Sequence, residues 1–202
     1  MILYLLLPVV LLRLGLRGLR SPAYWRRWSE RFGYAPVMQA GCIWLHAVSV
    51  GETRAAVPLV RALMQRYPQR PVLITTMTPT GSAQVRALFG DQVAHCYVPY
   101  DLPHVVQRFL GRVRPSLAII METELWPNLF RHCRLRGVPL LVANVRMSEK
   151  SMLRYLKFPA LTRATLEQVS LFGVQSETDA ARLRTLGAPH ERVRVTGSIK
   201  FE

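Results

Sequence analysis

The sequence has little lysine and few acidic residues. Of its 27 basic residues only three are lysines, which leaves 24 arginines, set against 12 acidic residues and a formal net charge of +15. An arginine-dominated balance suits phosphate groups, whether these belong to nucleic acid, to anionic lipid or to a phosphorylated substrate. The charge alone does not choose among these partners, because scattered arginines can equally reflect the base composition of the gene.

Several familiar cofactor and metal signals are absent. The three cysteines, Cys42, Cys96 and Cys133, are odd in number and widely separated, which disfavours a disulfide framework and predicts buried thiols in a reducing compartment. No cysteine or histidine pair has zinc-ligand spacing. The G-x-G-x-x-G fingerprint, the G-x-x-x-x-G-K-[ST] phosphate loop and nucleic-acid recognition motifs are all missing. We therefore expect no metal, no bound cofactor and no nucleic-acid partner.

The N-terminus carries an apolar run that is short for a membrane span. Residues 1–12 are apolar and arginines follow, whereas a span needs about 20 apolar residues. A cleaved signal peptide would carry its positive charges before the apolar stretch, so the order is reversed here. We expect residues 1–20 to be an uncleaved membrane anchor with the globular part on the cytoplasmic side. The alternative is a helix packed on the protein's own core. Residues 21–41 are expected to form a basic, aromatic linker, acting either as a membrane-interface belt or as a cap on the domain.

From residue 42 onward, segments typical of strands alternate with segments typical of helices. The expected strands are 42–48, 72–77, 93–98, 117–121, 140–144, 170–174 and 193–196. The expected helices are 52–67, 79–89, 103–113, 127–136, 147–166 and 177–186. Strict alternation of this kind predicts a parallel sheet covered by helices on both faces, a Rossmann-like α/β domain over residues 42–202.

The stretch H-A-V-S-V-G-E, which ends at Glu52, joins the first expected strand to the first expected helix. Ligands of doubly wound sheets bind where strand ends meet helix N-termini, so Glu52 would face a crevice. The helix dipole favours an ionised carboxylate there unless burial opposes it, and such a carboxylate can accept a proton from a hydroxyl. The alternative is an acid that only complements the helix N-terminus, and spacing alone favours this alternative.

Other loops bring polar side chains to the same edge of the predicted sheet. Residues 75–82 offer hydroxyls and N–H groups to a phosphate or sugar, or simply cap the next helix. Glu122 and Glu124 would lie on one side if the fourth strand continued through them, although either could instead pair with an arginine. The loops after the fifth and last strands add Arg146, Ser148 and Lys200.

Five motifs occur along the chain: H-A-V-S-V-G-E (46–52), T-T-M-T-P-T-G-S (75–82), Y-V-P-Y-D-L-P (97–103), M-E-T-E-L-W-P-N (121–128) and V-T-G-S-I-K (195–200). In this order they strongly resemble the bacterial 3-deoxy-D-manno-octulosonic acid (Kdo) transferase family, and the likeness covers the whole chain. The resemblance implies the N-terminal, acceptor-binding domain of a GT-B glycosyltransferase. The second, donor-binding domain would be absent from this chain.

The resemblance further implies inverting transfer of Kdo from CMP-Kdo to a lipid A precursor, lipid IVA, in lipopolysaccharide synthesis at the cytoplasmic side of the inner membrane. Glu52 would be the general base, and no metal would be needed. The implied substrate-binding residues are Ser49, Gly51, Thr78, Thr80, Gly81, Ser82, Glu122, Glu124, Arg146, Ser148 and Lys200. The isolated half is expected to be inactive. The alternative is a catalytically incomplete, membrane-associated module that binds the anionic lipid.

Overall fold

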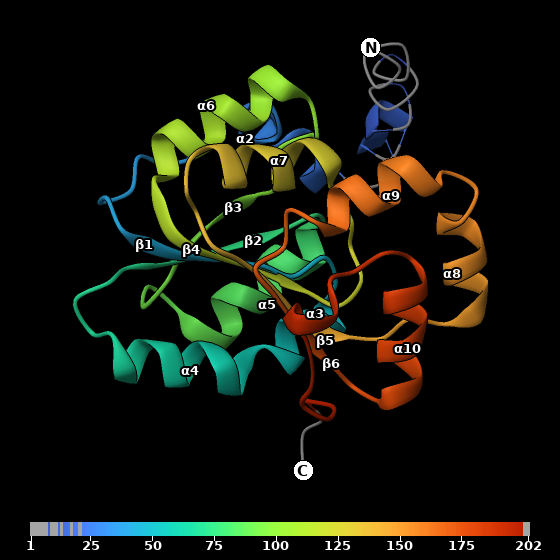
Figure 1. Ribbon diagram of the computed structural model, residues 1–202. Helices are drawn as coiled ribbons and strands as arrows, with labels where there is room; N and C mark the ends of the chain where they lie inside the picture. The colour runs from blue at the N-terminus through green and yellow to red at the C-terminus, as the bar shows by residue number, and fades with distance from the viewer. Residues whose placement is uncertain (1–7, 9–11, 13, 17, 20–21, 200–202) are drawn as a thin grey trace.

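The structure is a computed structural model that describes residues 8, 12, 14–16, 18–19 and 22–199 (Figure 1). Its centre is a seven-stranded parallel sheet with the order β3-β2-β1-β4-β5-β6-β7. The strands are β1 (Cys42–His46), β2 (Val72–Thr76), β3 (Ala94–Tyr97), β4 (Pro115–Met121), β5 (Leu140–Val145), β6 (Leu171–Val174) and β7 (Val193–Val195). The predicted Rossmann-like α/β sheet is confirmed.

The helices lie between the strands and cover both faces of the sheet (Figure 1). They are α2 (Trp28–Arg31), α3 (Val50–Ala55), α4 (Val57–Arg66), α5 (Pro79–Phe89), α6 (Pro103–Val113), α7 (Pro127–Leu135), α8 (Glu149–Tyr155), α9 (Pro159–Leu166) and α10 (Glu177–Thr185). Short 3₁₀ turns add η1 (Pro22–Trp25) and η2 (His190–Arg192).

The prediction that two segments each form one continuous helix is wrong. The segment 52–67 is divided at Ala56 into α3 and α4, and the segment 147–166 is divided after Tyr155 into α8 and α9. Proline causes both breaks, because it has no N–H to donate and its ring crowds the preceding turn. Pro58 lies in the first turn of α4, and Pro159 begins α9. The second break creates a sharp corner beside the site described below.

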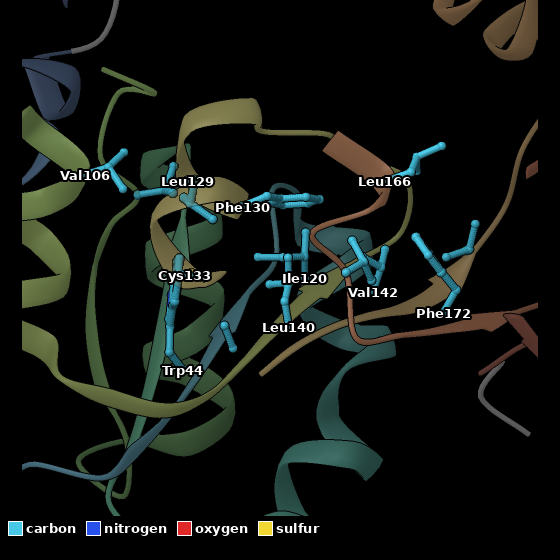
Figure 2. Close-up of a cluster of buried hydrophobic side chains, with 14 of the residues drawn as sticks. Trp44, Val106, Ile120, Leu129, Phe130, Cys133, Leu140, Val142, Leu166 and Phe172 are labelled. Atoms are coloured by element: carbon cyan, nitrogen blue, oxygen red, sulfur yellow. The ribbon is translucent and has the colours of Figure 1, made fainter. Parts of the chain in front are cut away.

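Alternating side chains of the strands form two separate apolar layers, because successive residues point to opposite faces. Trp44 is fully buried in the layer under α6, α7 and α9, where its ring meets Phe109 edge to face at 4.9 Å between centroids. Its neighbour Leu45 belongs to the layer under α4 and α5. Figure 2 shows the first layer, with Phe130 of α7 above Ile120 of β4. These layers fix the sheet and the ends of its strands.

The cysteines lie inside these layers as free, buried thiols. Burial raises the pKa of Cys42 to about 11 and that of Cys133 to about 12, so neither thiol ionises at neutral pH. The predicted burial is confirmed. The reducing compartment stays a prediction.

The segment before the sheet is tied to the edge strand β3. Arg27 pairs with Glu30 at 2.7 Å and donates to the carbonyl of His95 at 2.9 Å, while a Glu30 oxygen accepts the N–H of Tyr97 at 2.8 Å. The guanidinium of Arg31 is buried over the Tyr97 ring and donates to the carbonyl of Met77. This part of the linker therefore acts as a cap on the domain, which was one of the two alternatives.

The expected membrane anchor, residues 1–20, falls largely outside the described residues, as does Lys200. Within the part of the chain that the structure describes, no helix has the length and apolar character needed to cross a membrane.

The order of the strands decides where a site can form. After β1 the chain builds β2 and β3 on one side, and then returns to place β4 on the other side of β1. The connections that follow β1 and β4 therefore leave the sheet in opposite directions. Such a topological switch point opens a crevice at the carboxyl ends of the two strands.

Candidate active site

A cavity of about 590 Å³ opens at this switch point. Glu52 comes to it from the first turn of α3, which follows β1, while Glu122 and Glu124 come from the turn after β4 and Arg146 from the turn after β5. The remaining lining residues are Thr123, Ser151, Arg154, Tyr155 and Phe158. Three carboxylates and two guanidinium groups thus share one cavity, although Glu52 and Arg154 are about a hundred residues apart in the sequence.

Glu52 is held by the start of its own helix. Ser49 is the N-cap of α3, and its hydroxyl accepts the N–H of Glu52 at 3.2 Å and donates to the carboxylate at 3.0 Å. The other carboxylate oxygen accepts the N–H of Val48 at 2.8 Å. This arrangement is close to a capping box, in which a third-position acid and the N-cap side chain satisfy each other's N–H groups. Glu52 can therefore stabilise the start of α3 and also line the cavity.

Burial changes the acidity of Glu52. Its exposed fraction is only 7%, and this loss of solvent raises its pKa from 4.5 to about 7. Hydrogen bonds from Val48 and Ser49 oppose the rise, and the negative charges of Glu122 and Glu124 add to it. Burial therefore opposes the full ionisation expected from the helix dipole. A carboxylate with a pKa near neutrality is suited to both accepting and returning a proton.

Glu122 lies at a strained point of the backbone. Strand β4 ends at Met121, and Glu122 has a φ of 57°, a left-handed conformation that is rare outside glycine. The premise that the strand continues through Glu122 and Glu124 is therefore wrong. The turn brings both carboxylates to the cavity instead. No arginine lies within ion-pair distance of either among the described residues. Strain of this kind is often kept at functional sites.

Helix α8 forms the opposite wall, and the turn after β4 is bonded to it. The hydroxyl of Tyr155 donates to the carbonyl of Thr123 at 3.2 Å, and the Thr123 hydroxyl donates to the carbonyl of Arg146 at 2.6 Å. Burial is the main cause that raises the pKa of Tyr155, and the negative charge of Glu124 adds to it. Burial likewise is the main cause that raises the pKa of Glu124, and the negative charge of Glu122 adds to it. The cavity thus holds Glu52, Glu124 and Tyr155 toward their neutral forms.

His46 and Trp126 support the cavity from behind. The His46 ring is fully buried, contacts the Thr75 hydroxyl at 3.0 Å and meets the Trp126 ring edge to face at 5.8 Å between centroids. Burial lowers the pKa of His46 to about 4, so the ring is neutral at physiological pH. Trp126 follows the turn that carries Glu122 and Glu124, and its edge-to-face contact with His46 therefore anchors that turn to β1.

The other predicted site residues lie elsewhere. Thr78 is the N-cap of α5 and accepts the N–H of Gly81 at 3.1 Å, while Thr80 bonds to Thr78. Ser82 is buried and contacts Arg27 and His95. None of the four lines the cavity, nor do Ser49, Gly51 and Ser148, of which Ser148 caps α8. The capping alternative for residues 75–82 is confirmed, and a substrate role for these residues stays a prediction.

Sequence reasoning did not single out Thr123, Ser151, Arg154, Tyr155 or Phe158, which complete the cavity. Pro159, the first residue of α9, was the available signal, because it disfavours a continuous helix and leaves a corner before α9 from which Phe158 lines the cavity. Among the residues described, no group of three or more histidine, cysteine, aspartate or glutamate side chains is arranged to hold a metal ion.

Replacing Glu122 with glutamine should lower the pKa of Glu52 from about 7, because it removes the more effective of the two negative charges that add to the rise caused by burial. The measurement is a carboxyl carbon NMR titration of the selectively labelled protein. Glu149→Gln, an exposed site on α8 outside the cavity, is the control and should leave the midpoint unchanged. An identical Glu52 midpoint in both variants would show that Glu122 exerts no charge effect on it.

The fold and the cavity together define a doubly wound α/β domain with a candidate ligand site at its switch point. Solved structures of similar fold include a UDP-GlcNAc 2-epimerase from Neisseria meningitidis bound to UDP-GlcNAc, with a TM-score of 0.55 and 15% sequence identity. That match covers 78% of this chain and 47% of the other. A putative UDP-N-acetylglucosamine 2-epimerase from Listeria monocytogenes also has a TM-score of 0.55 at 15% identity, over 80% and 46% of the two chains. At this identity the similarity shows the fold alone.

Sequence comparison defines the family. The family model of 3-deoxy-D-manno-octulosonic-acid transferase, or Kdo transferase, matches residues 26–202. The chain is 45% identical to the Haemophilus influenzae Kdo transferase over 96% of its own length and 46% of the relative, and 38% identical to the Bordetella pertussis enzyme over 98% and 47%. The chain therefore belongs to the Kdo transferase family, as its motifs predicted. It spans about half the length of the curated relatives it matches.

Proposed function

We propose that this chain is the acceptor-binding half of a GT-B glycosyltransferase that moves Kdo from CMP-Kdo to lipid IVA, the lipid A precursor, in lipopolysaccharide synthesis. One observation carries the proposal. Glu52 lies buried at the switch point with a pKa of about 7, in one cavity with Glu122 and Glu124. Membership of the Kdo transferase family supplies the sugar and the reaction class.

In the proposed reaction, ionised Glu52 accepts the proton of an acceptor hydroxyl. The hydroxyl oxygen forms the new bond to the anomeric carbon of Kdo while the bond to the CMP phosphate breaks, and CMP leaves from the opposite face. The configuration at the anomeric carbon is therefore inverted. Because CMP leaves with a single phosphate, N–H groups and arginines can stabilise its charge without a divalent metal.

The other charges of the cavity fit an anionic acceptor. Arg146 and Arg154 are exposed at its wall, so they can meet acceptor phosphates without the desolvation cost of a buried guanidinium. Burial holds the pKa of Glu52 high and the charges of Glu122 and Glu124 add to this effect, which makes Glu52 a stronger base once it is ionised. Glu122 and Glu124 are thus positioning and tuning residues in this proposal, and Glu52 is the catalytic residue.

A second domain is part of the proposal, because the matched relatives are about twice as long as this chain. That domain would hold most of CMP-Kdo, so the isolated half should transfer no sugar. Because the acceptor is a lipid, we place the protein at the cytoplasmic side of the inner membrane, with residues 1–20 as anchor. The alternative is a module that binds the anionic lipid acceptor without chemistry.

The test is Kdo transfer from CMP-Kdo to lipid IVA, assayed with this chain alone and with the chain fused to the C-terminal half of the Haemophilus influenzae relative. The fusion is expected to transfer Kdo and the chain alone to transfer none. A fusion that binds both substrates but transfers nothing would contradict the enzyme assignment and favour the binding module. Transfer by the chain alone would contradict the need for a second domain.

A further inference from the structure

The corner between α8 and α9, residues 149–166, exposes an unusual amount of apolar surface, and we call it the α8–α9 elbow (Figure 1, orange). Leu153 is 54% exposed, Phe158 67% and Leu161 55%, and Leu156 between them is also exposed. No residue of α8 is buried. Scattered single apolar residues are ordinary on a surface, but four within one corner mark an interaction site.

The charge of the elbow is positive. Lys150, Arg154, Lys157 and Arg163 are exposed there, against the single acid Glu149. Arg163 pairs with Glu167 at 3.8 Å, whereas no acid lies within ion-pair distance of the other three in the described part of the chain. Apolar side chains interleaved with unpaired basic ones are the pattern of protein segments that lie in the interface of an anionic bilayer.

The position of the elbow adds to this argument. Phe158 and Arg154 line the acidic cavity as well as the elbow, and Leu161 borders a groove of about 400 Å³ between α7 and α9 that Arg131 also lines. A bilayer in contact with the elbow would therefore lie directly beside Glu52. A lipid acceptor could then bring its headgroup to the cavity while its acyl chains stay in the membrane.

We infer that the α8–α9 elbow is a lipid-contacting surface that seats the domain on an anionic bilayer, independently of residues 1–20. The inference deepens the proposed membrane location and rests on it. Its test measures lipid contact rather than sugar transfer, so a failure of the lipid contact can be distinguished from a failure of the proposed reaction.

The buried thiols make a direct test practical. Cys42, Cys96 and Cys133 are fully buried, so a single introduced cysteine can be labelled selectively with an environment-sensitive fluorophore. The labelled variants are Phe158→Cys in the elbow and Val37→Cys as the control, since these side chains are 67% and 66% exposed. Vesicles of phosphatidylcholine, alone or mixed with phosphatidylglycerol, are the probe.

The label at position 158 should shift its emission to the blue and brighten severalfold on anionic vesicles, while the label at position 37 should not respond. Sedimentation of the protein with vesicles, without a change in the emission of the label at position 158, would overturn the inference. So would an equal response to purely zwitterionic vesicles. A response that needs only higher protein concentration, without vesicles, would assign the elbow to a second copy of the chain and overturn it as well.

A charge variant provides the second test. Lys157→Gln should weaken partition to anionic vesicles about fivefold, because one basic residue near such a surface contributes about 1 kcal/mol. Arg61→Gln, an exposed site on α4 with no side-chain partner in the described residues, is the matched control and should change partition little. Equal effects of the two substitutions would show that overall charge, and not the elbow, drives binding.

Discussion

Replacing Glu52 with glutamine in the fused two-domain protein is expected to reduce kcat by about 10² to 10⁴-fold, the usual contribution of a general base. Glutamine preserves the shape of the side chain and can still accept one of the hydrogen bonds from Val48 and Ser49. It cannot accept a proton. Acceptor binding should be retained, because the Arg146 and Arg154 side chains are unchanged.

The same substitution should not weaken the fold at high pH. Glu52 has a pKa of about 7 in the folded protein against 4.5 ordinarily, so the folded state binds its proton more tightly and loses stability as pH rises from about 4.5 through about 7. Glutamine does not titrate. After allowance for one lost hydrogen bond, Glu52→Gln should be about 1 kcal/mol more stable than the parent protein at pH 8, measured by urea unfolding.

Asp179 offers a structural twin as control. It occupies the same third position of α10, accepts from the Ser176 hydroxyl and the N–H of Met147, and lies outside the cavity. Asp179→Asn should cost about 1 kcal/mol of stability and leave kcat of the folded protein unchanged. If Glu52→Gln instead unfolds the protein, and its residual activity follows the folded fraction, then Glu52 is a helix cap and not the base.

Replacing Asp101 with alanine is expected to lower the free energy of unfolding by about 3 kcal/mol. Helix α7 has no capping side chain of its own, since Trp126 occupies the N-cap position. Asp101 reaches across from the loop before α6 and accepts the N–H groups of Asn128 at 3.1 Å and Leu129 at 2.7 Å. Alanine leaves both N–H groups without their charged acceptor.

Urea unfolding measures the loss, with two comparison variants. Asp101→Asn keeps one acceptor oxygen, so it should cost about half as much. Asp91→Ala, at an exposed acid after α5, should change stability by no more than about 0.5 kcal/mol. Because α7 directly follows the turn with Glu122 and Glu124, Asp101→Ala should also lower kcat in the fused protein. A stability equal to that of Asp91→Ala would show that the cap is energetically unimportant.

The sheet was predictable from the sequence, whereas the cavity was only partly so. Short apolar runs bounded by turns identify strands such as β4 regardless of their neighbours. Local pattern does not state that β1 and β4 are adjacent, and this adjacency is what brings Glu52 and Glu122 together. Residues after β1, β4 and β5 were correctly placed at one edge, but the separate position of Thr78 depended on the three-dimensional arrangement.

The pKa of Glu52 and the backbone strain at Glu122 could not be predicted from the sequence either, because both depend on the three-dimensional arrangement. The dipole of α3 favours ionisation of Glu52, but the extent of its burial is set by residues far along the chain. The left-handed backbone of Glu122 leaves no sign in a run such as M-E-T-E. The break before α9 could have been predicted, because a proline such as Pro159 disfavours a helical conformation in the residue before it.

The attachment of Arg27 and Glu30 to β3 has a consequence for solubility. Strand β3 is an outer strand of the sheet, and its free backbone groups form a template on which a strand of another molecule could pair. The side chains of Arg27 and Glu30 already occupy the carbonyl of His95 and the N–H of Tyr97 on that side. The segment before the sheet therefore covers an edge that would otherwise be open to edge-to-edge pairing with another molecule.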